Sequence, residues 1–353
     1  MAAGTGSSVD TPLHLRPLLV PKPWGGRRLE RFGKDLPAGA MIGESWEVAD
    51  LDPSATSVED PVSRVASGPH AGRTLQEVIA TDRDGLLGDA PDLDGRFPLL
   101  VKLLDAREHL SVQVHPPADY VADHPEVSHK TESWVVLDAE PGAELMIGVA
   151  SGVTTGSLAS AVGTPALVPM LRRVPAVPGE VHHLPAGTIH ALPAGVMVAE
   201  VQTPGDTTFR VYDWVDKYGR TPRALHLREA LRSIELGWEH NLAAASSFGA
   251  GSPGRAGAAA GGRVKRRARG TVVDTPHYRI ARRHLDAAGT RSVDRGTMRI
   301  VLVLDGVLQA DAFDHALGPG GTIVLPAAWA GCLQAGDEPA TWLELTVPPK
   351  GNR

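Results

Sequence analysis

The hydrophobic residues of this 353-residue chain fall mostly in short runs of strand length, separated by Gly, Pro and Asp. Runs of this kind, bounded by turn residues, predict a β-sandwich or β-barrel. The chain also holds 39 Gly and 29 Pro, which suits a turn-rich β protein better than a helical one. The runs before residue 240 are ESWEVAD, FPLLVKLLDA, LSVQVH, SWVVLDA, ELMIGVA, VHHLPAG, VMVAEVQ and FRVYDWV.

Helical patterns are few. The stretch LHLREALRSIE (225–235) places apolar residues three to four apart, which predicts an amphipathic helix. Shorter helices are predicted at TLQEVIATD (74–82) and near residues 155–162. The fold class expected from these patterns is therefore mainly β with a few short helices.

The patterns divide the chain into four parts. We expect a disordered tail over 1–12, a large β-domain over 13–240, a flexible linker or loop over 241–270, and a smaller β-domain over 271–353. The linker is rich in Ala, Gly and Ser and would bury too little to order itself. In the last part GGTIVLPA repeats the rhythm of GEVHHLPAG without its histidines, so we interpret the second domain as a degenerate relative of the first.

Composition excludes several function classes. The formal net charge of −6 argues against nucleic-acid binding, which needs a basic surface. The basic string RVKRRARG at the end of the linker is interpreted as a solvated cluster. No apolar run reaches the ~18 residues of a membrane span, and the N-terminus lacks the pattern of a signal peptide. The single cysteine, Cys332, excludes an intrachain disulfide, so we expect a cytoplasmic protein.

The stretch LSVQVHPPADY (110–120) contains two candidate functional residues. In a strand, Gln113 and His115 would point to one face, and Val112 and Val114 to the other. Polar side chains on an interior face are costly unless something pairs them. From this stretch alone, either water or a metal ion could be that partner.

The stretch GEVHHLPAGTIH (179–190) resembles the second half-motif of the cupin β-barrels, in which a tight turn delivers a histidine into the barrel. Pro185 fixes φ and Gly187 frees it, so the turn sets the register of the next strand. That register decides whether His190 faces inward or outward.

The first cupin half-motif supplies two histidines one residue apart and then a glutamate. Here Gln113 and His115 take the first two places, and HKTESWVVLDAEPG supplies Glu132. Each residue alone is more often a satisfied polar group than a ligand. Together with His190 they form a set of nitrogen and oxygen donors that suits a divalent ion such as Zn²⁺.

Several longer motifs resemble one family within the cupins. The strings SVQVHP, KTESWVV, PAGTIHA, EVQTPGDTTFRVYDW and RALHLREAL occur in the order found in class I (zinc-dependent) phosphomannose isomerases. Upstream, PKPWGG, GESWEVAD and GRTLQEVI are similar to the shorter bacterial branch of that family. The resemblance covers roughly residues 15–235 and is weaker beyond. It implies two jelly-roll barrels of cupin type, a catalytic one over 13–240 and a smaller, degenerate one over 271–353.

The resemblance also implies a cofactor and a reaction. The family holds one zinc ion per chain and interconverts mannose 6-phosphate and fructose 6-phosphate through an enediol. Its ligands carry over to Gln113, His115, Glu132 and His190. We expect none of the neighbouring histidines to be ligands: His109, His124, His129, His182 and His183.

Other candidate residues lie within the same motifs. Arg210 and Glu200 match an arginine and a glutamate that face the family's site, which implies catalytic roles for both. Arg210 could stabilise the enediolate or orient the sugar, and Glu200 could equally be a structural carboxylate. Lys130 would share the strand face of Glu132 and act as acid/base or as an electrostatic clamp. Ser111 could bind phosphate or a sugar hydroxyl. Lys102 could bind phosphate or lie at the solvent edge of a strand.

Two alternatives stay open. The chain could isomerise another sugar or sugar phosphate, because fold and metal do not fix the substrate. It could also be a non-catalytic cupin that binds sugar as a regulator, although Lys130 and Arg210 beside the ligand set count against that. A monomer and a homodimer are both compatible with the sequence, and the catalytic base is not settled.

Overall fold

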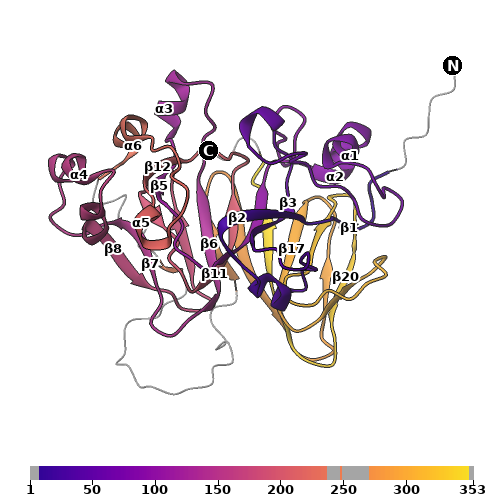
Figure 1. Cartoon of the computed structure of the whole chain (residues 1–353). Helices are drawn as coiled ribbons and strands as arrows, with labels where there is room; N and C mark the ends of the chain where they lie inside the picture. The colour runs from indigo at the N-terminus through magenta and orange to yellow at the C-terminus, as the bar shows by residue number, and fades with distance from the viewer. Residues whose placement is uncertain (1–7, 237–246, 249–269, 350–353) are drawn as a thin grey trace.

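The computed structural model describes residues 8–236, 247–248 and 270–349. Its strands form four antiparallel sheets, which stack in two pairs side by side (Figure 1). The predicted mainly β fold with few, short helices is confirmed. Among the described residues, no helix has the length and apolar character needed to cross a bilayer.

The first pair of sheets, called here the first sandwich, joins a seven-stranded and a five-stranded sheet. The seven-stranded sheet has the order β13 (Ser247–Phe248), β9 (Val181–Leu184), β6 (Glu132–Ala139), β11 (Val196–Gln202), β4 (Leu100–Ala106), β3 (Ile42–Val48), β2 (Leu18–Gly26). The five-stranded sheet has the order β12 (Phe209–Tyr212), β5 (Val112–Val114), β10 (His190–Ala191), β7 (Glu144–Val149), β8 (Leu171–Pro175). The two prolines of β2 fit its place at a sheet edge, where a missing N–H costs no ladder bond.

The second pair of sheets, called here the second sandwich, is smaller. Its six-stranded sheet has the order β1 (Leu13–His14), β19 (Thr322–Leu325), β17 (Arg299–Asp305), β21 (Ala340–Thr346), β15 (Arg279–Leu285), β14 (Gly270–Asp274). Its three-stranded sheet has the order β16 (Thr290–Val293), β20 (Gly331–Ala335), β18 (Leu308–Ala310). The N-terminal strand β1 thus pairs with a sheet that is otherwise C-terminal, with Leu13 opposite Val324.

The three predicted helices are present as α1 (Leu75–Thr81), α4 (Thr155–Ala161) and α6 (Leu227–Ser233). Thr74 and Glu77 form a capping box at the start of α1, which satisfies two of its free backbone N–H groups. The patterns did not predict the remaining helices, each of which is too short to show a helical period. These are α2 (Arg83–Leu87), α3 (Ala118–Asp123), α5 (Val215–Tyr218) and the 3₁₀ helices η1 (Arg28–Phe32), η2 (Pro53–Ala55) and η3 (Pro165–Met170).

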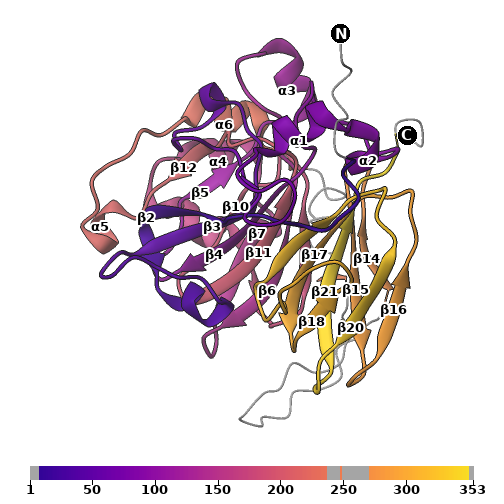
Figure 2. The ribbon, with the colours of Figure 1, turned by 90° about the vertical axis from the view of Figure 1, so that its right-hand side faces the viewer.

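The two sandwiches share an apolar seam between the seven-stranded and six-stranded sheets (Figure 2). Strand β11 shows how the sequence builds it: Met197 and Ala199 face the seam, whereas Val196 and Val198 face the interior of the first sandwich. Both faces of the strand are therefore buried, which explains its unbroken apolar run. By the same alternation, Glu200 points into the interior of the first sandwich.

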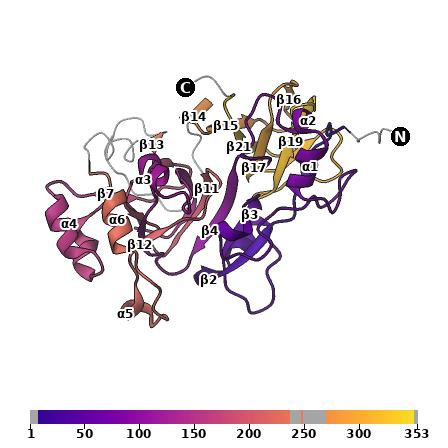
Figure 3. The same cartoon turned by 90° about the horizontal axis from the view of Figure 1, so that it is seen from above.

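Viewed from above, α1 and α2 lie against the C-terminal strands, and α3, α4 and α6 lie on the side of the first sandwich (Figure 3). The N–H of Ala327 donates to the carbonyl of Leu86 in α2, which ties the N-terminal half to the second sandwich. Of the predicted tail and linker, residues 1–7, 241–246 and 249–269 lie outside the described residues. Val9 is fully buried, and its N–H donates to Asp82 Oδ2 at 3.0 Å.

Candidate metal centre and active-site cavity

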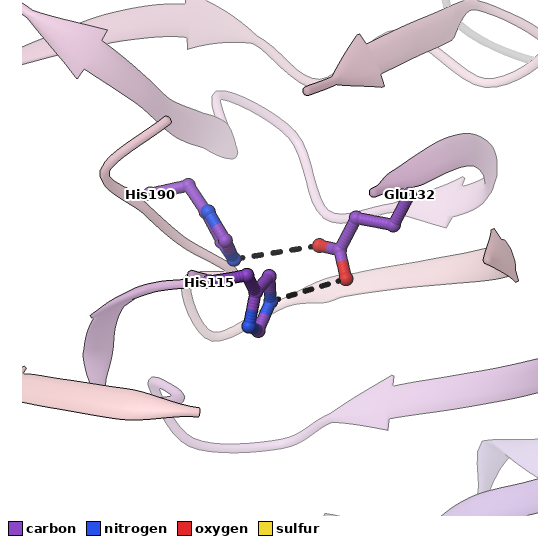
Figure 4. Close-up of side chains that lie close together, drawn as sticks. All are labelled: His115, Glu132 and His190. Atoms are coloured by element: carbon purple, nitrogen blue, oxygen red, sulfur yellow. Dashed lines mark ion pairs between the residues drawn. The ribbon is translucent and has the colours of Figure 1, made fainter. Parts of the chain in front are cut away.

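Three buried side chains from both sheets of the first sandwich converge at one point (Figure 4). Glu132 begins β6, His190 begins β10, and His115 follows β5. His115 Nε2 lies 3.3 Å from Glu132 Oε2, and His190 Nε2 lies 3.4 Å from Glu132 Oε1. The candidate ligand atoms all lie within 4.8 Å of one another. We call these three residues the metal cluster; it contains none of the five neighbouring histidines.

The hydrogen bonds on the far side of each ring fix its tautomer. His115 Nδ1 lies 2.9 Å from the carbonyl of Thr207, and His190 Nδ1 lies 2.9 Å from that of Thr188. A carbonyl only accepts, so each Nδ1 carries the proton and each Nε2 turns a lone pair toward Glu132. Burial, together with the charge of Lys130, lowers the pKa of His115 to about 4, which keeps the ring neutral.

In the metal cluster, hydrogen-bond acceptors of His115, His190 and Glu132 therefore face one another, and none of them carries a proton to donate. His115 Nε2 and both oxygens of Glu132 are buried and have no hydrogen-bond partner. Burial alone would raise the pKa of Glu132, but the positive charge of Lys130 holds it well below its usual range. Lys130 lies beside Glu132, but in the described part of the chain no side-chain cation lies between the carboxylate and the two imidazole lone pairs that face it. Acceptors crowded together at this depth are costly, and a divalent cation between them removes that cost. The donor set thus fits a metal ion.

Gln113 lies directly beside the metal cluster. It pairs with His190 across β5 and β10, and its amide Nε2 lies 3.2 Å from His190 Nε2. Its Oε1 accepts from Ser111 Oγ at 3.2 Å. Amides bind metals through oxygen, and a half-turn of the amide group exchanges its oxygen and nitrogen. Gln113 is therefore placed to serve as a fourth donor.

The Pro185-Ala186-Gly187 turn sets the position of His190. The N–H of Thr188 donates to the carbonyl of Pro185 at 3.1 Å, and Gly187 has φ of +86°, which favours glycine. The N–H of Gly187 donates to the carbonyl of His115 at 2.9 Å. This bond ties the turn to one ligand while the strand after it delivers the other.

A cavity of about 420 Å³ opens beside the metal cluster, with Gln113 and Lys130 in its wall. Its size is in the range of pockets for small ligands. Apolar side chains form part of the lining: Trp24, Leu104, Leu110 and Trp134. Hydroxyl groups are contributed by the segment around η2 and by the residues just before β5 and β12: Ser54, Thr56, Ser57, Ser111 and Thr208.

Lys102, Lys130 and Glu200 form a buried ionic network in the wall of this cavity. Glu200 and Lys102 are cross-strand partners, and Lys102 Nζ lies 3.4 Å from Glu200 Oε1. Lys130 Nζ lies 3.1 Å from Glu132 Oε2 and 3.8 Å from Glu200 Oε1. Burial would lower the pKa of Lys130, but the carboxylates of Glu132 and Glu200 raise it overall. Both lysines are therefore held as cations.

Lys102 is buried rather than at a solvent edge. Its ammonium also lies 3.7 Å from Glu44 Oε2 and 3.8 Å from Asp206 Oδ1. Burial would raise the pKa of Glu44, but Lys102 and Lys22 lower it to about 2. The charge of Lys102 is thus shared among three carboxylates.

Arg210 differs from the other cavity-lining cations. Arg223 donates from Nε and Nη2 to both oxygens of Asp213, at 2.7 and 2.9 Å. Arg210 donates one N–H to the carbonyl of Ala224, and its Nε has no partner. Among the cations that line the cavity, all in the described part of the chain, Arg210 forms no ion pair.

The sequence patterns missed several residues of this site. Asp206 and Arg223 lie inside recognised motifs, so the motifs were the available signal for them. The segment around Ser54 and Thr56 gave no local signal. It reaches the cavity through a tertiary contact, in which Thr56 Oγ1 donates to Asp206 Oδ2 at 2.7 Å.

Comparisons with known proteins add a family context to this geometry. A model of the phosphomannose isomerase type I catalytic domain matches residues 13–150. The chain is 36% identical over 229 residues to the mannose-6-phosphate isomerase of Streptococcus mutans, across 64% of this chain and 68% of the relative. The mannose-6-phosphate isomerase ManA of Bacillus subtilis matches to the same extent. The crystal structure of a mannose 6-phosphate isomerase from Bacillus subtilis superposes with a TM-score of 0.75 at 27% identity, covering 95% of this chain and 99% of that one.

Proposed function

Because the chain belongs to the type I phosphomannose isomerase family, we propose that it interconverts mannose 6-phosphate and fructose 6-phosphate with one Zn²⁺ per chain. The observation that carries this proposal is the metal cluster, whose buried acceptors face one another beside a cavity lined with cations. The substrate is inferred from the names of the relatives. The geometry supports this inference, because a site suited to a metal lies beside a cavity suited to an anionic sugar.

We propose His115, Glu132, His190 and Gln113 as the zinc ligands. Two imidazoles, a carboxylate and an amide oxygen form a set without thiolate that suits zinc. When bound, the ion would supply a Lewis acid for the oxygens on C1 and C2 of the sugar.

Arg210 is the cavity cation best suited to the phosphate, because it forms no ion pair with a carboxylate in the described part of the chain. A guanidinium matches a phosphate in geometry as well as charge. Arg223 lines the same cavity and adds positive charge, although Asp213 holds it. Ser111 and Lys102 are proposed to contact the sugar, with Lys102 also fixing the carboxylates around it.

We propose that Glu200 and Lys130 act in the proton transfer. Isomerisation moves one proton from C2 to C1 through an enediol, and a second proton passes between the two oxygens. Glu200 is a buried carboxylate at the cavity, paired with Lys102 and Lys130, and is our candidate for taking the carbon-bound proton. Lys130 is our candidate for neutralising negative charge that develops on the oxygens.

The test combines metal analysis and turnover on one purified sample. We expect about one zinc per chain and conversion of mannose 6-phosphate in a coupled assay, with activity lost on chelation and restored by zinc. Specificity constants for other aldose phosphates, measured in parallel, should be lower. Full turnover after complete metal removal would refute the metal assignment, and a higher specificity constant for another sugar phosphate would refute the substrate.

A further inference from the structure

The back of strand β6 carries a second polar group next to the metal cluster. Glu132 points into the first sandwich, so Ser133, its neighbour, points the opposite way. The cross-strand partner of Ser133 is Val201, which packs in the apolar seam between the two sandwiches. Ser133 is fully buried there, and a buried hydroxyl in such a place needs partners.

One of its partners comes from the second sandwich. Ser133 Oγ lies 3.0 Å from the hydroxyl of Tyr278 and 3.0 Å from His183 Nδ1. Tyr278 immediately precedes β15 and is fully buried. A chain in which Tyr278 donates to Ser133, and Ser133 donates to His183, uses each hydroxyl hydrogen once. This polar chain crosses the seam directly behind Glu132.

Tyr278 is itself held in place. Its N–H donates to Thr275 Oγ1 at 2.9 Å, and its carbonyl accepts from the hydroxyl and the N–H of Thr275 at 2.8 and 3.0 Å. Three bonds to one residue fix the backbone from which the ring projects. The ring also meets that of His183 edge-on.

His277, the residue before Tyr278, contacts the N-terminal end of the segment 129–133, which contains Ser133. The rings of His277 and His129 lie 5.2 Å apart, and His129 immediately precedes Lys130. Two consecutive residues of the second sandwich, 277 and 278, therefore bracket residues 129–133. That segment carries both Lys130 and Glu132.

We propose that Tyr278 is a positioning residue, which holds the metal ligand Glu132 in place through Ser133. The second sandwich would then contribute to metal affinity although it supplies no ligand. Tyr278 lies outside residues 13–150, which match the catalytic domain model. Losing a group that orients a ligand typically costs ~10–100-fold in metal affinity.

The test measures zinc affinity by competition with a chromophoric chelator, using the full chain. Tyr278→Phe and Ser133→Ala should each weaken zinc binding ~10–100-fold. The double variant should be no weaker than the weaker single variant, because both act through one contact. At saturating zinc, kcat for mannose 6-phosphate should stay within about threefold of wild type, since every ligand remains.

Two control variants separate positioning from general effects. Tyr120→Phe removes a hydroxyl from a buried ring on α3 that packs on His124 and Phe209, neither of which is a metal ligand, and should leave zinc affinity unchanged. Leu345→Val trims a fully buried side chain in the same seam and should lower thermal stability while leaving zinc affinity unchanged. Equal weakening by Leu345→Val and Tyr278→Phe would overturn the proposal.

This inference rests on the proposed metal site, and the two fail in different ways. Wild-type protein that binds no zinc would overturn the metal site and this inference with it. Tight binding by wild type, with equally tight binding by Tyr278→Phe, would overturn this inference alone.

Discussion

The two sandwiches share an architecture but fill their interiors differently. The first holds an apolar cluster around Trp134 and Leu184, and beside it the ionic network of Lys102, Lys130 and Glu200. The second is packed with apolar side chains, among them the fully buried Trp342. The first interior therefore combines an apolar cluster with buried, ion-paired charges around a cavity, whereas the interior of the second is mainly apolar.

The turn motifs show how few positions make this difference. Strand β9 and its turn read VHHLPAGTIHA (181–191), and strand β19 and its turn read TIVLPAAWAGC (322–332). His182 matches Ile323, and the ligand His190 matches Gly331. The same strand-and-turn pattern thus supports either a packed core or a metal site, and the side chains at matched positions decide which.

The largest effect is expected from removing a metal ligand. His190→Ala should lower turnover of mannose 6-phosphate by more than ~100-fold, because losing only a partner of a ligand already costs ~10–100-fold in affinity. Zinc content, measured on the same sample, should fall with it. His284→Ala in β15 of the second sandwich is the matched control and should retain both. Retained turnover in His190→Ala would contradict the proposal that the first sandwich, unlike the second, holds a catalytic metal.

Lys130→Met should lower turnover while leaving the metal in place. This change removes the ammonium beside Glu132 and Glu200 while keeping much of its bulk, and should lower kcat by ~10²–10³-fold. Zinc content should stay near that of wild type, which separates loss of chemistry from loss of the metal. An unchanged kcat would make Lys130 a structural cation.

A core truncation in the second sandwich should affect stability rather than chemistry. Trp342→Ala removes a fully buried ring and should lower the free energy of unfolding by ~3–5 kcal/mol. At temperatures where the variant is folded, kcat should match that of wild type. Denaturant unfolding and the coupled assay on one preparation check both parts.

The smallest effect concerns His182, which is fully buried with neither ring nitrogen hydrogen-bonded; its nearest carboxylate, Glu180, is 3.9 Å away. His182→Ile installs the residue that the second sandwich has at this position. It should raise the free energy of unfolding by ~1–3 kcal/mol, the usual cost of a buried unsatisfied polar group.

The pH dependence sharpens that prediction. Burial, helped by the charge of Arg172, lowers the pKa of His182 to about 4 from 6.5. Between these values the unfolded chain binds more protons than the folded one, so wild type loses stability as the pH falls through this window. His182→Ile should lose less over the same range. Parallel pH profiles for the two proteins would contradict the assignment of a buried neutral His182.

The sequence predicted the fold class and the family, and both are confirmed. Short apolar runs bounded by turn residues predicted the strands, and the cupin half-motifs singled out His115, Glu132 and His190, which the structure brings together. The three helices with a clear period were found, whereas α2, α3 and α5 were too short to leave one. The specific site roles stay proposals.

What the sequence did not reveal depends on contacts between distant segments. Thr56 reaches the cavity through Asp206, 150 residues later, and Tyr278 reaches Ser133 across the seam from another sheet. Neither contact has a periodic or motif signal, because each arises only when segments far apart in the chain pack together. Lys102 was likewise ambiguous in its strand until Glu44, Glu200 and Asp206 were placed around it.

Anomalous diffraction from crystals of the zinc-loaded protein, collected on both sides of the zinc absorption edge, would locate the metal. We predict one peak per chain, bounded by His115, Glu132, His190 and the amide oxygen of Gln113, and none inside the second sandwich. A peak elsewhere in an active, zinc-containing protein, or none at the metal cluster, would contradict it.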